Sequence, residues 1–201
     1  MTPHPSTTAS LPGNGTQWLD TYPSHLARTW TLASGEVLSV RPVRHDDDRR
    51  EEAFVHGLSR ESRYQRLLSG GIKMTPEWIE RMTHIDYRRH MAFALTTVND
   101  GVEQFVGVVR YVVAPTEASA EIGLVIADAW QGKGLGRRLL QALLEHAKGA
   151  GLHEVQGTVL ATNRAMLSLA LSLGFRVSTE PNDATVVRIR RSLAKANPQL
   201  H

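Results

Sequence analysis

The stretch Glu121-Ile-Gly-Leu-Val-Ile-Ala-Asp-Ala-Trp-Gln-Gly-Lys-Gly-Leu-Gly136 joins a run of strand-forming residues to a loop with three glycines at alternate positions. From Leu135 to Ala147 apolar residues recur at helical spacing, which predicts an amphipathic helix. Glycine has no Cβ, so the loop backbone can approach a ligand closely. The first N–H groups of the helix lack partners within it, and together with the helix dipole they favour an anion. The sequence therefore predicts a phosphate-binding loop between a strand and a helix.

Two common phosphate-binding motifs do not fit this loop. No Gly-Lys-Ser/Thr follows a first glycine at the spacing of a P-loop. Counted from Gly132 or Gly134, the last glycine of the dinucleotide motif is replaced by another residue. What remains is Gln-x-x-Gly-x-Gly from Gln131 to Gly136, followed about thirty residues later by Asn163 and then by Gly174-Phe175.

In this order the two motifs resemble those of the GNAT (Gcn5-related) N-acetyltransferase superfamily. Upstream, Trp30 to Arg44 and Gly57 to Arg66 are similar to the acetyltransferase domain of bacterial Pat-type protein-lysine acetyltransferases. The similarity covers roughly residues 26 to 193. It implies an α+β (mixed α/β) fold of the GNAT type, with a central, mostly antiparallel twisted sheet flanked by helices.

The resemblance implies acetyl-CoA as co-substrate and no metal. Main-chain groups of three strand residues are expected to pair with the pantetheine arm like a further strand, and the glycine loop to receive the pyrophosphate. Asn163 is expected to bond the cofactor, and it also suits the N-cap of the helix that follows. Lys133 and Arg137 either add charge at the phosphates or are solvated surface charges. The expected cofactor-binding residues are Leu124, Val125, Ile126, Gln131, Gly132, Lys133, Gly134, Leu135, Gly136, Arg137 and Asn163.

Acetyl transfer to an amine requires a base, because an ammonium with a pKa of about 10.4 is free amine in only about one molecule in 2,500 at pH 7. Glu121 is the candidate, since Pat-type enzymes similarly carry a glutamate there, and strand alternation places it on the face of Gly123 and Val125. The alternative is a solvated strand-end glutamate. Other GNAT enzymes use a tyrosine or a glutamate at the positions of Ala170 and Thr158, so the sequence identifies no general acid.

The acceptor is expected to be a protein lysine, by resemblance alone. A small-molecule amine, or a non-catalytic CoA-binding sensor, remains as an alternative. Arg63, Tyr64 and Arg66 form a cluster at helical spacing near the expected acceptor site, but a structural or surface role is favoured for them. His84 and His90 lack a convincing third ligand, which argues against a metal site.

Composition narrows the class of protein further. A net charge of +3 over 201 residues is modest for a nucleic-acid binder, and no run approaches the roughly 20 apolar residues of a membrane helix. The chain has no cysteine and no apparent secretory signal, so we expect a cytoplasmic protein.

We expect a flexible arm over residues 1–24, one GNAT domain over residues 25–193 and a tail over residues 194–201. The sequence sets no oligomeric state.

The hydrophobic pattern predicts the order of the elements. Expected strands cover residues 29–32, 37–43, 91–97, 103–113, 121–126, 154–159, 175–178 and 185–190, and expected helices cover residues 46–56, 60–68, a segment after Thr75-Pro76, 135–150 and 164–173.

Overall fold

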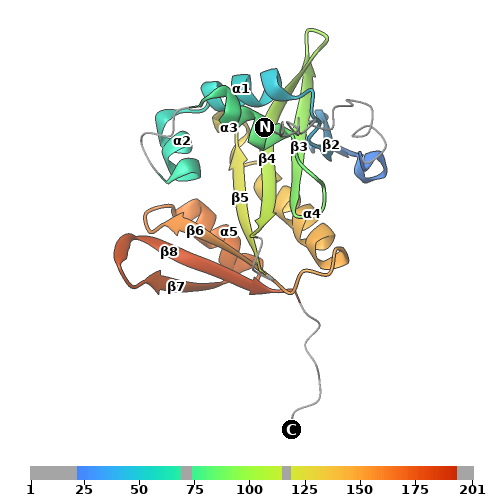
Figure 1. The fold of residues 1–201 in the computed structure, drawn as a ribbon. Coiled ribbons are helices and arrows are strands. Elements are labelled where there is room, and N and C mark those ends of the chain that lie inside the picture. The colour runs from blue at the N-terminus through green and yellow to red at the C-terminus, as the bar shows by residue number, and fades with distance from the viewer. Residues whose placement is uncertain (1–21, 69–73, 115–118, 194–201) are drawn as a thin grey trace, which may run out of the picture.

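The computed structural model describes residues 22–68, 74–114 and 119–193. These residues form one eight-stranded sheet in the order β1-β2-β3-β4-β5-β6-β8-β7, with helices packed against it (Figure 1). The β5–β6 pair is parallel, and every other neighbouring pair is antiparallel. The expected fold class, a mostly antiparallel sheet flanked by helices, is confirmed.

Every expected element is present, with ends that differ by a few residues. The strands are β1 (Arg28–Thr31), β2 (Val37–Pro42), β3 (His90–Asn99), β4 (Val102–Val113), β5 (Ser119–Ile126), β6 (Glu154–Leu160), β7 (Arg176–Glu180) and β8 (Asp183–Ser192). The helices are α1 (Asp48–Gly57), α2 (Arg60–Leu67), α3 (Pro76–Thr83), α4 (Leu135–Gly149) and α5 (Arg164–Ser172), with 3-10 turns η2 (Ser24–Leu26) and η3 (Asp128–Trp130).

The sheet separates two groups of buried apolar side chains. On one face, α4 contributes Leu139, Leu140 and Leu143 to the larger core. On the other face, α1 contributes Phe54 and Val55 to a second cluster. Alternation along β5 follows this division: Ile122 and Ile126 belong to the α4 core, whereas Val125 packs against the α1 cluster. The face that carries Val125 is therefore the one covered by α1 to α3.

Local sequence accounts for several element ends. Asp100 and Gly101 both have positive φ, as a tight β3–β4 turn requires. Thr75 caps α3, because its hydroxyl accepts from Trp78 N–H. Asp47 is the N-cap residue of α1, but its side chain makes no capping hydrogen bond. Its side chain is used instead in a buried ion pair.

That ion pair belongs to a network that joins β2, the start of α1 and β4. The Arg41 guanidinium donates to both Asp47 oxygens, at 2.7 and 2.8 Å, and to both Glu103 oxygens at 2.9 Å. The side chains of Arg41 and Asp47 are buried. The hydrogen bond from Arg41 lowers the pKa of Glu103 to about 2.

Within the described part of the chain, no helix combines the length and apolarity that membrane spanning needs. The expected tail, and the expected arm apart from residues 22–24, lie outside the described residues.

Candidate active site

A cleft opens where β5 and β6 separate. Along one edge β5 pairs with β4 from Ala120 to Ile126, but along the other it pairs with β6 only from Ser119 to Glu121. Beyond that segment the two strands diverge, with α2 and α5 on either side of the opening (Figure 1). A cavity of about 650 Å³ lies there, lined by β5, α2, the glycine loop, β6 and α5. This volume is in the usual range of small-molecule sites.

The glycine loop forms one end of the cleft. Gly132 and Gly134 have φ of +74° and +75°, a conformation that strains any residue with a Cβ. Gly134 is the N-cap residue of α4. Because glycine has no side chain, it cannot accept a hydrogen bond from the first N–H groups of the helix. Gly132, Gly134, Leu135 and Gly136 all line the cavity. The loop can therefore accept an anion on its main chain.

The two basic side chains of the loop contact other groups. Lys133 Nζ lies 4.5 Å from the centroid of the Trp130 ring and 3.7 Å from Glu36 Oε2. Arg137 lines the cavity and donates a 2.7 Å hydrogen bond to Ser172 Oγ. Among the described residues expected to bind the cofactor, Lys133 alone does not line the cleft.

Asn163 and the cofactor strand line the middle of the cleft. Asn163 Oδ1 accepts from Met166 N–H at 3.0 Å, so the capping role is present, while the residue also borders the cavity. Leu124, Val125 and Ile126 lie on the part of β5 that has left β6. Their edge has no strand partner in the described residues, which suits pairing with an extended ligand.

Helix α2 is tied to the glycine loop by contacts that the sequence did not reveal. Asp128 accepts hydrogen bonds from Ser59 N, Ser59 Oγ and Ser62 Oγ at 2.7–2.8 Å. The bond from Ser59 N–H lowers the pKa of Asp128. Gln131 Nε2 donates to Ser62 Oγ at 3.1 Å and to Ile126 O at 3.0 Å. These partners stand up to 69 residues apart, so no local pattern announces them.

Glu121 lies at the vertex of the cleft, on the last β5 residue that pairs with β6. It faces Val112 on β4 and Gln156 on β6 in register, and it is exposed and lines the cavity. Thr158 also lines the cavity, whereas Ala170 is fully buried. The expected base therefore lies in the cleft, and no acidic group occupies the other two positions.

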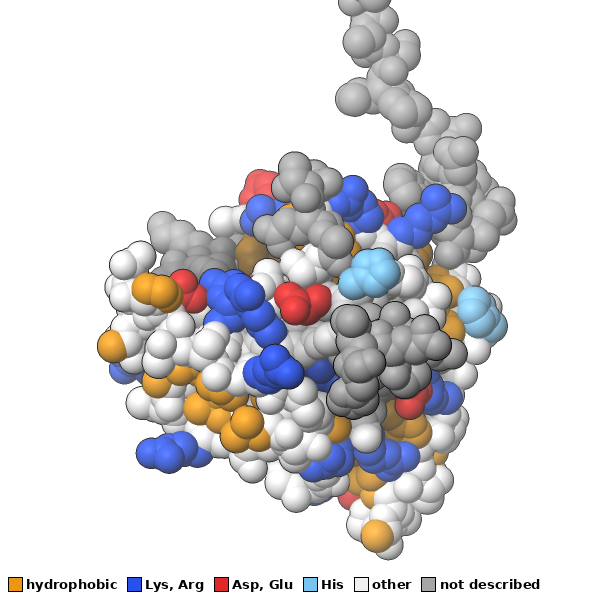
Figure 2. Space-filling view, turned by 90° about the horizontal axis from the view of Figure 1, so that it is seen from below, with side chains coloured by type: hydrophobic (Ala, Val, Ile, Leu, Met, Phe, Trp, Pro, Cys, Tyr) orange, Lys and Arg blue, Asp and Glu red, His pale blue; other side chains and the backbone are white. Residues whose placement is uncertain are grey.

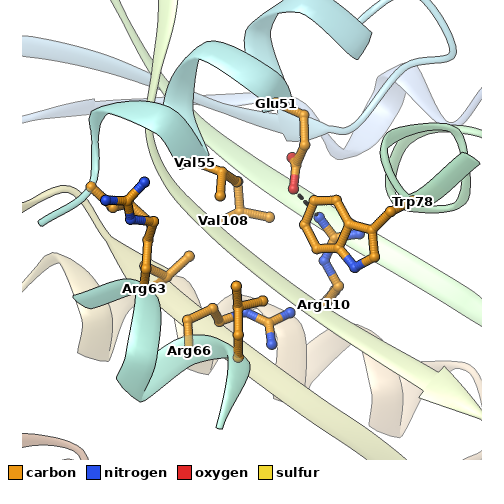
Figure 3. A pocket seen from close by; sticks show the side chains of 10 residues that line it. Glu51, Val55, Arg63, Arg66, Trp78, Val108 and Arg110 are labelled. Carbon is orange, nitrogen blue, oxygen red and sulfur yellow. Dashed lines mark hydrogen bonds and ion pairs between the residues drawn. The ribbon is translucent and has the colours of Figure 1, made fainter. Parts of the chain in front are cut away.

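A buried charged cluster lies beneath this end of the cleft, at the small pocket drawn in Figure 3. Arg110 on β4 donates to Glu51 Oε1 on α1 at 2.8 Å, and each side chain is 4% exposed. Arg110 also donates to Met82 O at 2.8 Å, and its other close neighbour is His90 Nε2 at 3.4 Å. Burial and the charge of Arg110 lower the pKa of His90 to about 4, so this ring is neutral at pH 7.

Arg66 belongs to the cluster that the sequence placed near the expected acceptor site. It lines both the cleft and the small pocket, and Figure 3 shows its guanidinium directed toward Arg110 rather than alongside Arg63. A Cβ added at Gly123 would lie 2.8 Å from Arg66 Cζ, so the guanidinium lies directly on the cofactor strand. Burial and the like charge of Arg110 lower the pKa of Arg66 to about 10. It therefore remains charged at neutral pH.

Charge on the surface is unevenly distributed. On the face in Figure 2, Lys and Arg side chains gather near the middle beside an acidic group, with hydrophobic side chains exposed to one side.

Among the described residues, no group of three or more His, Cys, Asp or Glu could hold a metal ion.

Comparison with known proteins agrees with the fold. The family model for the acetyltransferase (GNAT) domain matches residues 38–176. The chain is 34% identical to an acetyltransferase of Pseudomonas aeruginosa, over 81% of this chain and 88% of that one. It is 31% identical to an L-methionine sulfoximine/L-methionine sulfone acetyltransferase of Pseudomonas paraeruginosa, over 49% of this chain and 59% of that one.

A solved structure also shows similarity to GNAT acetyltransferases. The GNAT domain of S. lividans PAT superposes with a TM-score of 0.74 at 27% identity, over 85% of this chain and 99% of that domain. The chain belongs to the GNAT acetyltransferase family, whose members are acetyl-CoA-dependent N-acetyltransferases. Acetyl-CoA is accordingly its co-substrate.

Proposed function

We propose that the protein transfers the acetyl group of acetyl-CoA directly to a primary amine, with Glu121 as the base. The observation that supports this most is the position of Glu121 at the vertex of a cleft whose other end is the glycine loop. The pyrophosphate binds the main chain from Gly132 to Gly136. The pantetheine arm then follows the open edge of β5 toward Glu121.

The transfer needs no covalent enzyme intermediate. Glu121 takes a proton from the acceptor ammonium, and the amine nitrogen attacks the thioester carbon. The C–N bond forms, the C–S bond breaks and CoA leaves as a thiolate, which takes the second proton from the amine nitrogen, so that the products are a neutral amide and the CoA thiol. A main-chain N–H near Val125 or Ile126 donates to the carbonyl oxygen as negative charge develops there.

Two acceptor classes are supported. The resemblance of the sequence to Pat-type protein-lysine acetyltransferases supports a protein lysine, and the chain is similar in structure to the GNAT domain of S. lividans PAT. The match to an L-methionine sulfoximine/L-methionine sulfone acetyltransferase supports a small-molecule amine. A cytoplasmic location is proposed with either acceptor.

The substitution Glu121→Gln tests the proposed chemistry. We expect kcat to fall about 10²- to 10⁴-fold for any acceptor, while the Kd for acetyl-CoA stays within about threefold. Glu154→Gln, a carboxylate on β6 outside the cleft lining, is the matched control and should leave kcat unchanged. Unchanged turnover in Glu121→Gln would show that another group is the base. Binding of acetyl-CoA without acetylation of any amine would favour the CoA-binding sensor.

A further inference from the structure

Arg66 presents its guanidinium to the cleft without a direct partner. It lines the cavity from α2, and among the described residues it makes no hydrogen bond or ion pair, although the carboxylates of Glu51 and Glu121 act on it electrostatically from a longer distance. Its neighbour Arg110 differs, because Glu51, Met82 O and His90 surround that guanidinium. A guanidinium carries five N–H donors in a planar fork that matches a carboxylate. Unpaired donors in a substrate cleft therefore point to an anionic group on the ligand.

Arg66 lies away from the loop expected to bind the pyrophosphate of the cofactor. The guanidinium lies over Gly123, whereas the pyrophosphate loop begins eight residues further along the chain at Gln131. Gly123 also precedes Leu124 to Ile126, the segment that pairs with pantetheine. Arg66 is thus on the acceptor side of the reacting thioester.

Glu121 and Arg66 together form a pair of opposite charges along one face of β5. Gly123, over which the Arg66 guanidinium lies, follows Glu121 by two residues on the same face, so the Cα atoms of these two strand residues are about 7 Å apart. In an α-amino acid the amine and the carboxylate share one carbon. With a hydrogen bond of about 2.8 Å at each end, such a molecule spans a similar distance. Its amine fits at the carboxylate of Glu121 and its carboxylate at the guanidinium of Arg66.

We propose that Arg66 binds a carboxylate of the acceptor, and that the acceptor is a free amino acid with its amine and carboxylate on the same or neighbouring carbons. This inference rests on the proposed N-acetyltransferase function. A lysine side chain within a protein has no carboxylate near its ε-amine, so it would leave Arg66 unpaired. The transfer step is unchanged: the amine is acetylated, its proton passes to Glu121 and CoA is released.

The test compares each of the twenty standard L-amino acids with its own carboxamide as acceptor for acetyl-CoA, read by thiol release and mass spectrometry. For at least one amino acid we expect a kcat/KM about 10- to 100-fold above that of its amide. In Arg66→Met this ratio should fall at least about tenfold, mainly through the KM of the acid. The acid and its amide have different amine pKa values, but this difference affects the acid-to-amide ratio equally in the wild type and in Arg66→Met. It therefore cancels when the two enzymes are compared.

Two further variants separate recognition from a structural effect. Arg60→Met removes an exposed arginine from the same helix and should leave the acid-to-amide ratio unchanged. Gly123→Ala places a methyl group where the Arg66 guanidinium lies, so it should lower the ratio while Arg66 itself is retained. Thermal unfolding and acetyl-CoA binding confirm that each variant is folded.

Several outcomes would overturn the inference. The first is an equal kcat/KM for acids and amides in the wild-type enzyme. The second is an equal loss of kcat/KM for both acceptors in Arg66→Met, which would indicate that Arg66 acts at the thioester oxyanion or in folding. Acetylation of a lysine peptide but of no amino acid would overturn it while the proposed function stands. If no amine of any kind is acetylated, the proposed function fails with it.

Discussion

Gly134 and Gly101 have nearly the same backbone conformation, with φ of +75° and +76°, but only Gly134 borders the cleft. Alanine should cost about 1 kcal/mol of folding free energy at either position, because φ is positive in both. We expect Gly134→Ala also to weaken acetyl-CoA binding at least about tenfold, since its methyl group obstructs the approach of the phosphate to the main chain. Urea unfolding and isothermal titration calorimetry measure the two effects.

Gly101→Ala is the matched control, because the hairpin turn between β3 and β4 contains the same strain without a ligand. It should lose stability and keep its affinity for acetyl-CoA. If both variants bind acetyl-CoA as tightly as the wild type, the glycine loop does not hold the phosphates.

These residue-level features divide clearly into those the sequence could predict and those it could not. The glycine loop was predictable because its cause is local: a strand, three alternate glycines and the start of a helix are adjacent in the chain. For Arg66 the sequence indicated only a cluster near the expected acceptor site, because the position of its guanidinium over Gly123 depends on α2 folding over β5. The Arg110–Glu51 pair joins residues 59 apart in the same way. No spacing rule connects such partners.

At the level of elements, the network around Arg41 holds β2, α1 and β4 together. The hydrogen bond from Arg41 lowers the pKa of Glu103 from 4.5 to about 2, so the ionised form is favoured in the folded state. A lowered folded-state pKa contributes stability that is present above about pH 4.5 and is lost as the pH falls toward about 2. This network should therefore weaken in acid.

The substitution Glu103→Gln tests that pH dependence. We expect a lower free energy of unfolding at neutral pH and a flatter dependence on pH between about 4.5 and 2, because the titrating group is gone. Urea unfolding at a series of pH values measures it. Glu145→Gln, which removes an exposed carboxylate 3.9 Å from Arg28, should change neither value. Parallel pH profiles for Glu103→Gln and the wild type would contradict this account.

Element order was predictable from the hydrophobic pattern, but element ends were not always. The start of α1 illustrates the reason: Asp47 lies at the N-cap position, where a carboxylate commonly caps a helix, but its side chain makes no capping hydrogen bond. Its carboxylate accepts instead from the buried Arg41, at 2.7 and 2.8 Å. A charge-assisted, two-bond contact with a distant strand outweighs a single local cap.

At the scale of the whole molecule, the cleft lies between two parts of the sheet, β1 to β5 and β6 to β8, that are joined by a short segment of strand pairing. Among the described residues three pairs join β5 to β6, whereas seven join β4 to β5. The glycine loop and β5 line one wall, and β6 with Asn163 and α5 line the other. A ligand that contacts both walls adds the contacts that the separated strands lack.

Acetyl-CoA should accordingly stabilise the whole fold. A ligand that binds only the folded state at about 100 times its Kd adds about 2.7 kcal/mol to the free energy of unfolding. For a domain of this size that corresponds to a rise in Tm of about 5–10 °C. Differential scanning calorimetry with increasing acetyl-CoA measures the shift. The rise at a given concentration should be smaller in Gly134→Ala and unchanged in Gly101→Ala, because only the first alters the ligand site. An equal rise in wild type and Gly134→Ala would mean that acetyl-CoA gains its affinity away from the glycine loop.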